Sequence, residues 1–111
     1  MAYDEGLAER IRKSLNKHRS LEARRMFGGL AFMLDGKMCC GVLKDDLVLR
    51  LGPEGALKAL AKRHVRPMDF TRRPLTGFVY VSPRGYAGAA LGRWLKPAVS
   101  YARSLPKKQE K

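Results

Sequence analysis

The chain has 111 residues, 45% of them hydrophobic, which is enough for one globular domain with a buried core. Its 23 Lys and Arg residues outnumber 10 Asp and Glu residues and give a formal net charge of +13. This composition argues against a disordered chain, and Asp4, Glu5 and Glu9 argue against a signal peptide at the start. Because the apolar runs are too short to cross a bilayer, we expect a cytoplasmic protein with reduced thiols and no membrane contact.

The first predicted element is an amphipathic helix over residues 5–18. Asp4 is a suitable N-cap, since its carboxylate can accept a hydrogen bond from the first free backbone N–H groups. Leu7, Ile11 and Leu15 follow at intervals of four residues, which places them on one face of a helix. That face is expected to pack against the rest of the domain.

Residues 23–51 change to the pattern of β-strands. Three apolar runs are separated by turn signals, and they lie at 30–34, 38–43 and 47–51. Asp35-Gly36 is a strong two-residue hairpin signal, and Asp45-Asp46 makes the next turn. In the run at 47–51 leucines alternate with other residues, as expected for a strand that is buried on one face only. We therefore expect a three-stranded antiparallel meander, and pairing of residues 22–27 as a fourth strand stays open.

A second helix is predicted from Gly52-Pro53-Glu54 onward. Proline is well tolerated at the first helical position, because the N–H that it lacks has no intrahelical partner there. Four apolar residues should form the inner face of this helix: Ala56, Leu57, Leu60 and Ala61. Basic residues should then lie on its outer face.

The C-terminal part of the chain predicts one more strand and one more helix. The strand spans 78–81, and the helix spans 87–105 with an interior Pro97 that should kink or split it. The element order α-β-β-β-α-β-α predicts an α+β fold with helices packed on one antiparallel sheet. We expect one domain over residues 1–106 and a disordered basic tail at 107–111.

Several motifs together give the chain a family resemblance. The segments "MFGGLAFM", "MCCGV" and "RPMDF", with "MAYDEGLAERIR" before them and "WLKPAVSYARSLP" after them, resemble the TfoX N-terminal domain family over residues 1–106. The resemblance implies a small α+β domain whose meander carries the first two motifs. The family is named after bacterial regulators of natural competence, for which it implies transcriptional co-activation with a cyclic-AMP receptor protein. Their second, helical domain is expected to be absent here, and no catalytic residues come with the family.

The adjacent pair Cys39-Cys40 raises three alternatives: a redox centre, a metal site or part of the core. Neighbouring residues of a strand point to opposite faces, so the two thiols should diverge. The pair lacks C-x-x-C spacing, and His18 and His64 do not lie at metal-ligand spacing. We expect a buried Cys40 in a core role, no metal and no cofactor. The remaining alternative is a reactive Cys39 on the outer face of the sheet.

Basic residues near aromatic side chains form a candidate nucleic-acid surface. The proposed contacts are two basic pairs and one further arginine: Arg24, Arg25, Arg66, Arg72 and Arg73. Prolines should hold the segment 66–74 in an extended loop, so the arginines could converge at one end of the sheet. Phe27, Met68 and Phe70 are expected in the core, with Asp69 capping a turn.

The sequence leaves three alternative functions. The first is a non-enzymatic regulatory or adaptor domain that acts through protein contacts, and the second is a weakly sequence-specific nucleic-acid binder. The third is a redox or enzymatic module. The sequence shows no nucleophile triad, carboxylate pair or metal-ligand constellation, so we expect no enzyme. His18 and His64 should each end a helix, and Trp94 should lie at the edge of the core. The sequence also allows the chain to form a homodimer.

Overall fold

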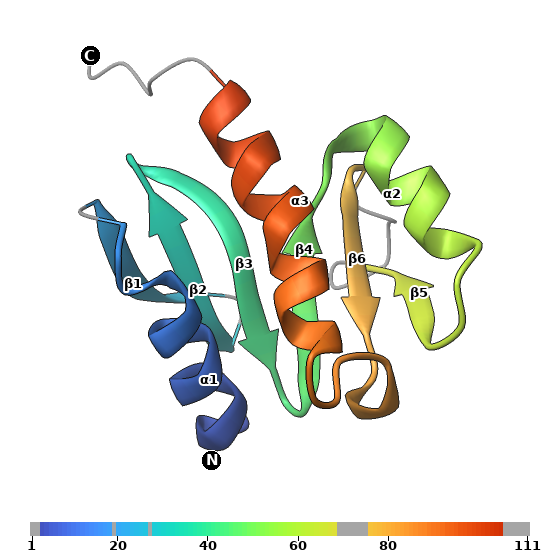
Figure 1. The fold of residues 1–111 in the computed structure, drawn as a ribbon, viewed down its shortest axis with the longest axis horizontal. Helices are drawn as coiled ribbons and strands as arrows, with labels where there is room; N and C mark the ends of the chain where they lie inside the picture. Colours follow the sequence, from blue (N-terminus) through green and yellow to red (C-terminus); the bar gives the residue numbers. More distant parts are fainter. Residues whose placement is uncertain (1–2, 19, 27, 69–75, 106–111) are drawn as a thin grey trace.

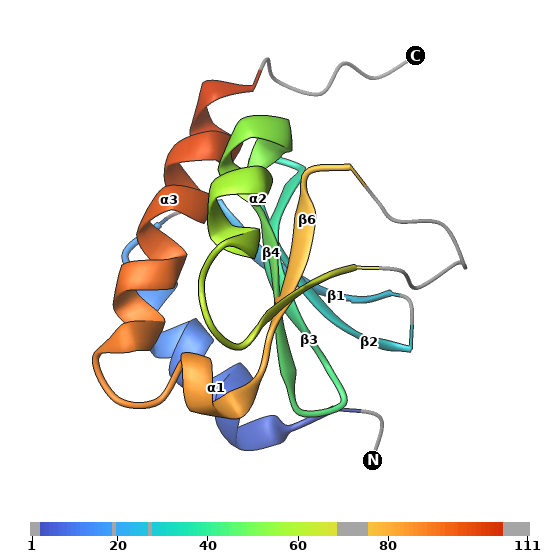
Figure 2. The same cartoon turned by 90° about the vertical axis from the view of Figure 1, so that its right-hand side faces the viewer.

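The computed structural model describes residues 3–18, 20–26, 28–68 and 76–105, and these form a six-stranded antiparallel sheet with three helices on one face (Figures 1 and 2). In chain order the elements are α1 (Glu5–Leu15), β1 (Leu21–Met26), β2 (Gly29–Leu34), β3 (Lys37–Leu43), β4 (Asp46–Arg50), α2 (Gly52–Leu60), β5 (Val65–Pro67), β6 (Phe78–Val81) and α3 (Ala90–Ser104). The strand order across the sheet is β1-β2-β3-β4-β6-β5. The predicted α+β class is confirmed.

Helix α1 begins where its capping residue predicts. The Asp4 carboxylate accepts a hydrogen bond from the Leu7 backbone N–H at 3.1 Å, and Leu7, Ile11 and Leu15 are buried. The helix ends at Leu15, so the predicted end at His18 is wrong.

The sheet contains two strands more than the predicted element order. β1 pairs with β2, which decides the alternative left open at 22–27, and β5 pairs with β6. β5 has only three residues and one of them is proline, so it carries no alternating pattern that the sequence could reveal. The hairpin at Asp35-Gly36 is confirmed: both residues have positive φ angles, 54° and 78°, as a two-residue turn of this kind requires.

The core consists of two layers, one on each face of the sheet. The larger layer lies under the helices, and the smaller lies on the face that the helices leave uncovered, which we call the open face. Leu47 and Leu49 belong to the helix side, whereas Val48 packs on the open face near Met68 and Tyr80. β4 is therefore buried on both faces, and the expectation of a half-buried strand was wrong. The predicted core role of Met68 is confirmed.

A β-bulge in β3 changes the placement of the two cysteines. Phe32 pairs with Cys40, but the next residue, Met33, pairs with Met38, so Cys39 is an extra residue without a partner on β2. Both cysteines consequently pack in the helix-side core and are fully buried as free thiols. The expectation of diverging thiols was wrong, and the alternative of Cys39 on the outer face does not hold, whereas burial of Cys40 is confirmed.

The two later helices differ from the prediction in detail. α2 packs on the sheet through Ala56 and Ala59, whereas Leu57 is 72% exposed, so its placement on the inner face was wrong. Ala61 lies past the end of α2 and is exposed. α3 crosses the sheet as one helix from Ala90 to Ser104, so Pro97 does not split it, and a kink at Pro97 stays a prediction (Figure 1).

Two further predictions concern single side chains. Trp94 is partly buried at the edge of the helix-side core, as expected, and its indole Nε1 donates a hydrogen bond to the Gly85 carbonyl at 2.9 Å. His64 does not end a helix, because α2 stops at Leu60 and His64 follows with a φ of 68°. The predictions for Phe27, Asp69, Phe70 and the tail at 107–111 lie outside the described residues.

Candidate functional site

Of the arginines predicted to bind nucleic acid, the fold separates Arg66 from Arg24 and Arg25. Arg24 and Arg25 lie on β1, and Arg66 lies on β5, while Arg72 and Arg73 are outside the described residues. β1 and β5 are the two edges of the sheet. Five strand spacings, about 24 Å along the sheet, therefore separate Arg24 from Arg66. The expected convergence at one end of the sheet does not hold for these residues.

Two of these arginines already bind carboxylates of the same chain. The Arg66 guanidinium contacts Asp46 at 2.7 Å and donates to the Ser82 hydroxyl at 2.9 Å, while its plane lies over the Tyr80 ring. Arg24 makes a two-point contact with Glu22 at 3.2 and 3.3 Å. Exposed pairs of this kind contribute at most about 1 kcal/mol, so a phosphate could replace the carboxylate. Nucleic-acid contact by these residues stays a prediction.

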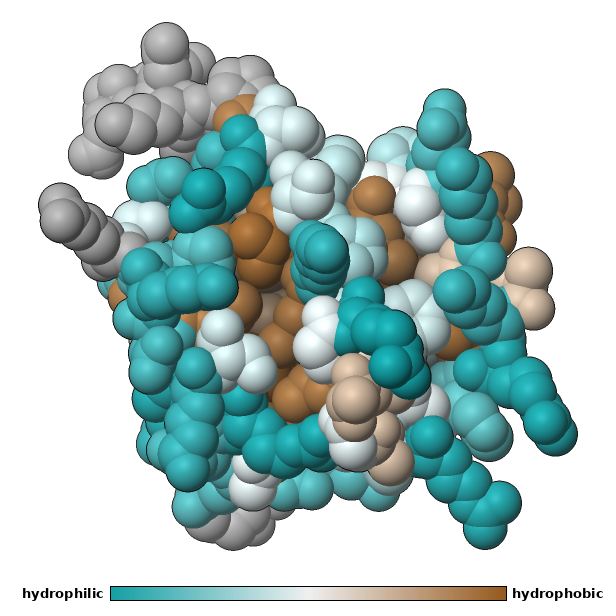
Figure 3. Space-filling model, viewed as in Figure 1, coloured by the Kyte–Doolittle hydropathy of each residue, from teal (hydrophilic) through white to brown (hydrophobic). Residues whose placement is uncertain are grey.

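Positive charge is less balanced on the helix-covered face. α3 carries three basic residues and no acidic residue over its whole length, and they are Arg93, Lys96 and Arg103. Lys17 follows the end of α1, and neither Lys17 nor Lys96 has an ion-pair partner among the described residues. In Figure 3, which views this face, hydrophilic side chains surround an apolar strip. Such unpaired charge of one sign attracts acidic partners.

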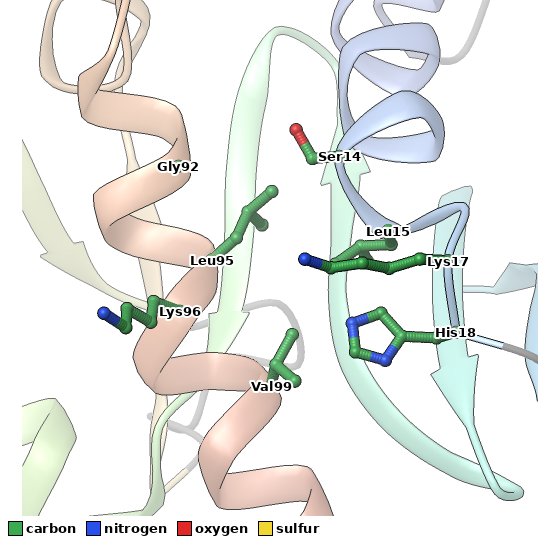
Figure 4. A pocket seen from close by; sticks show the side chains of 8 residues that line it. All are labelled: Ser14, Leu15, Lys17, His18, Gly92, Leu95, Lys96 and Val99. Atoms are coloured by element: carbon green, nitrogen blue, oxygen red, sulfur yellow. The ribbon is translucent and has the colours of Figure 1, made fainter.

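A groove of about 480 Å³ lies between the end of α1 and the middle of α3 (Figure 4). Its lining comes from both helices and the turn after α1: Ser14, Leu15, Lys17, His18, Gly92, Leu95, Lys96 and Val99. The floor is apolar, since Leu15 and Leu95 are buried and Val99 is partly buried. None of these eight residues is acidic. We call this site the α1–α3 groove.

Basic groups border the α1–α3 groove at one end. In Figure 4 the Lys17 side chain reaches across the groove toward α3, the His18 imidazole lies beside it, and Lys96 turns toward the outer side of α3. A neighbouring hollow shares Lys17 and His18 and adds Ser20, Asp35 and Arg103. Arg103 Nη2 lies 2.7 Å from His18 Nδ1. Partial burial, together with the positive charges of Arg103 and Lys17, lowers the pKa of His18, so the imidazole can accept this hydrogen bond as a neutral group.

The cysteine pair has the wrong environment for a reactive site. The hydrogen bond with Cys39 and the loss of solvation raise the pKa of the Cys40 thiol, which disfavours the reactive thiolate. Across the described residues, no group of three or more His, Cys, Asp or Glu side chains is arranged to hold a metal ion. No helix in that part of the chain is long and apolar enough to span a membrane.

Sequence reasoning missed the α1–α3 groove because its lining residues are far apart in the chain. Ser14 to His18 and Gly92 to Val99 meet only after α1 and α3 pack on the same face of the sheet. The signal that was available is the acid-free sequence of α3, which the overall net charge conceals.

The sheet and the helix layer define a small α+β domain, with the α1–α3 groove between two of its helices. Residues 13–102 match the family of the TfoX N-terminal domain, and the chain belongs to that family. It is a regulatory domain family that is not known for enzymatic activity. Neither the search of curated proteins nor the search of solved structures found a match to the chain.

Proposed function

We propose that this TfoX-type domain is a regulatory adaptor that acts on transcription through protein contacts and carries out no reaction of its own. The observation that supports this proposal most is the α1–α3 groove, in which an apolar floor lies beside unpaired basic side chains. Recognition sites for other molecules are typically concave and mostly apolar, with a few polar groups that fix orientation. Membership of a regulatory family adds to this support.

Transcript levels test the proposal in cells that produce the protein. Removing the chain should change a set of transcripts, and supplying the wild-type chain should restore them. The double variant Lys17→Glu and Lys96→Glu should fail to restore them, because it reverses the charge beside the groove. Lys58→Glu with Arg84→Glu is the matched control, with the same charge change at exposed positions outside the groove. Transcripts that do not respond to removal would overturn the regulatory function.

Direct nucleic-acid binding is the second candidate, and the unbalanced positive charge of α3 favours it. Fluorescence anisotropy with a labelled duplex and a labelled single strand, at low and near-physiological salt, tests it. Binding through phosphates should fall steeply with salt, because each neutralised phosphate releases a counterion. Replacing one phosphate-contacting arginine among Arg24, Arg25, Arg66, Arg72 and Arg73 should reduce the salt slope by about one. No binding at low salt would discard this candidate.

A further inference from the structure

We infer that the α1–α3 groove is the docking site for an acidic amphipathic helix of a partner protein. This inference rests on the proposed adaptor function, and it specifies the chemistry of the partner. Three independent features support it: a glycine that leaves the groove open, an aliphatic floor with helical spacing, and basic groups that lack acidic neighbours in the groove.

Gly92 is the feature that the fold itself does not explain. A Cβ atom built on Gly92 would meet no other atom within 4 Å, and its φ angle is not one that requires glycine. Glycine inside a helix is nevertheless less favourable than alanine by about 1 kcal/mol. Small residues allow another backbone to approach closely, and helices pack with their axes about 8–10 Å apart. The open space above Gly92 is therefore suited to a second chain.

The apolar floor has the length and spacing for a helical partner. Gly92, Leu95 and Val99 occupy positions i, i+3 and i+7 of α3, which place them along one side of the helix over about 10 Å. Leu15 closes the floor from α1. A groove of this kind recognises a bound helix by the apolar residues of that helix at i, i+3 or i+4, and i+7.

The charge around the groove selects an acidic partner. Lys17 and Lys96 line the groove, Arg103 lies at its His18 end, and no lining residue of the groove is acidic. The floor is formed by the aliphatic side chains of Leu15, Leu95 and Val99, and the imidazole ring of His18 at the end of the groove contacts Arg103. An aliphatic floor beside ammonium groups therefore fits Leu- or Ile-type anchors flanked by Asp and Glu better than it fits nucleic acid.

A selection experiment tests the inference while the partner protein is still unidentified. The probe is a displayed library of random peptides about 16 residues long, enough for roughly 24 Å of helix. The wild-type chain should enrich peptides with apolar residues at i, i+3 or i+4, and i+7 and with Asp or Glu between them. Enrichment of peptides without this pattern, or no enrichment at all, would contradict the inference.

Two tryptophan variants localise the binding. Gly92→Trp fills the open space above the groove and should lower the affinity for the enriched peptides by about tenfold or more. Ser100→Trp adds the same side chain to an exposed position of α3 outside the groove and should leave their affinity unchanged. Circular dichroism establishes that both variants are folded, and Lys17→Glu replaces Gly92→Trp if that variant is not. Equal affinities for Gly92→Trp and Ser100→Trp would overturn the site.

The outcome also separates this inference from the proposed function. If transcripts respond to the chain but Gly92→Trp leaves the affinity of the peptides unchanged, the regulatory role is retained and this groove is removed as its docking site. Peptides that bind the groove, combined with transcripts that do not respond, would retain the groove and remove the regulatory role. Displacement of the peptides by a DNA duplex at near-physiological salt would identify a polyanion site instead and overturn the inference.

Discussion

On the open face of the sheet two arginines pair with carboxylates of the same chain, whereas two lysines beside the α1–α3 groove, on the helix-covered face, lack an ion pair among the described residues. Arg24 binds Glu22 and Arg66 binds Asp46 on the open face. Lys17 and Lys96, on the other side, make no ion pair with any described residue. An excess of charge of one sign accelerates encounter with an oppositely charged partner. The comparison therefore supports the proposal that the open face has a structural role and the helix-covered face a role in recognition.

The largest expected effect tests whether the open face is structural. Met68 is 2% exposed within the apolar layer of that face, so Met68→Ala should lower the free energy of unfolding by about 2–5 kcal/mol. Leu57→Ala, at a side chain that is 72% exposed, is the control and should change it by no more than about 0.5 kcal/mol. Urea unfolding followed by circular dichroism measures both. A small effect at Met68 would mean that this layer contributes little to stability.

A pH effect tests how firmly the helix layer is anchored. Burial, and to a smaller extent Asp4, Asp45 and Asp46, raise the pKa of Tyr86 to about 12, and its hydroxyl donates to the Asp45 carbonyl at 2.6 Å. Because the folded state keeps this proton longer than the unfolded state, stability should be fully present below about pH 10 and fall between about pH 10 and 12.

Ultraviolet titration of the folded protein measures the ionisation of Tyr86 directly. One of the four tyrosines should ionise near pH 12, and Tyr86→Phe should remove that step. The variant should also show a shallower loss of stability over the same pH interval. A titration in which all tyrosines ionise together near their ordinary pKa would show that Tyr86 is not held in this environment.

A smaller effect on stability is expected at Gly92, on the helix-covered face. Gly92→Ala should raise the free energy of unfolding by up to about 1 kcal/mol, because alanine favours the helix and its Cβ meets open space. Thermal and urea unfolding of the variant beside wild type give the change. Destabilisation by alanine would imply that the groove is closed in solution and that Gly92 is needed for packing.

The smallest expected effect reports the charge at the end of the groove. Arg103→Ala should raise the pKa of His18 toward its ordinary value, because the variant removes one of the cations that disfavour the imidazolium. An NMR titration of the histidine ring protons follows this change. An unchanged His18 pKa would mean that the contact with Arg103 is not maintained in solution.

Local signals in the sequence predicted several elements correctly. Asp4 before a four-residue apolar repeat predicts α1, and Asp35-Gly36 between two apolar runs predicts the first hairpin. Each depends on residues within one turn or one hairpin, so neighbouring positions contain the information. The family resemblance, which the match over residues 13–102 confirms, draws on longer segments of the same kind.

Features that depend on tertiary pairing were missed. The bulge that brings Cys39 beside Cys40 in the helix-side core arises from the register between β2 and β3, which alternation within β3 alone cannot reveal. Leu57 has the spacing of an inner-face residue, but α2 packs on the core through Ala56, Ala59 and Leu60, and Leu57 faces solvent. The α1–α3 groove combines residues about 80 positions apart, so neither half indicates a site by itself.

Chemical-shift mapping tests the assignment of recognition to the helix-covered face most directly. The ¹⁵N-labelled full chain is titrated with an enriched acidic peptide at near-physiological salt. The account predicts that the largest amide shifts fall on the lining of the α1–α3 groove, among them Lys17, Gly92 and Val99. Shifts concentrated instead at Arg24 on β1 or Arg66 on β5, with the groove unchanged, would contradict it.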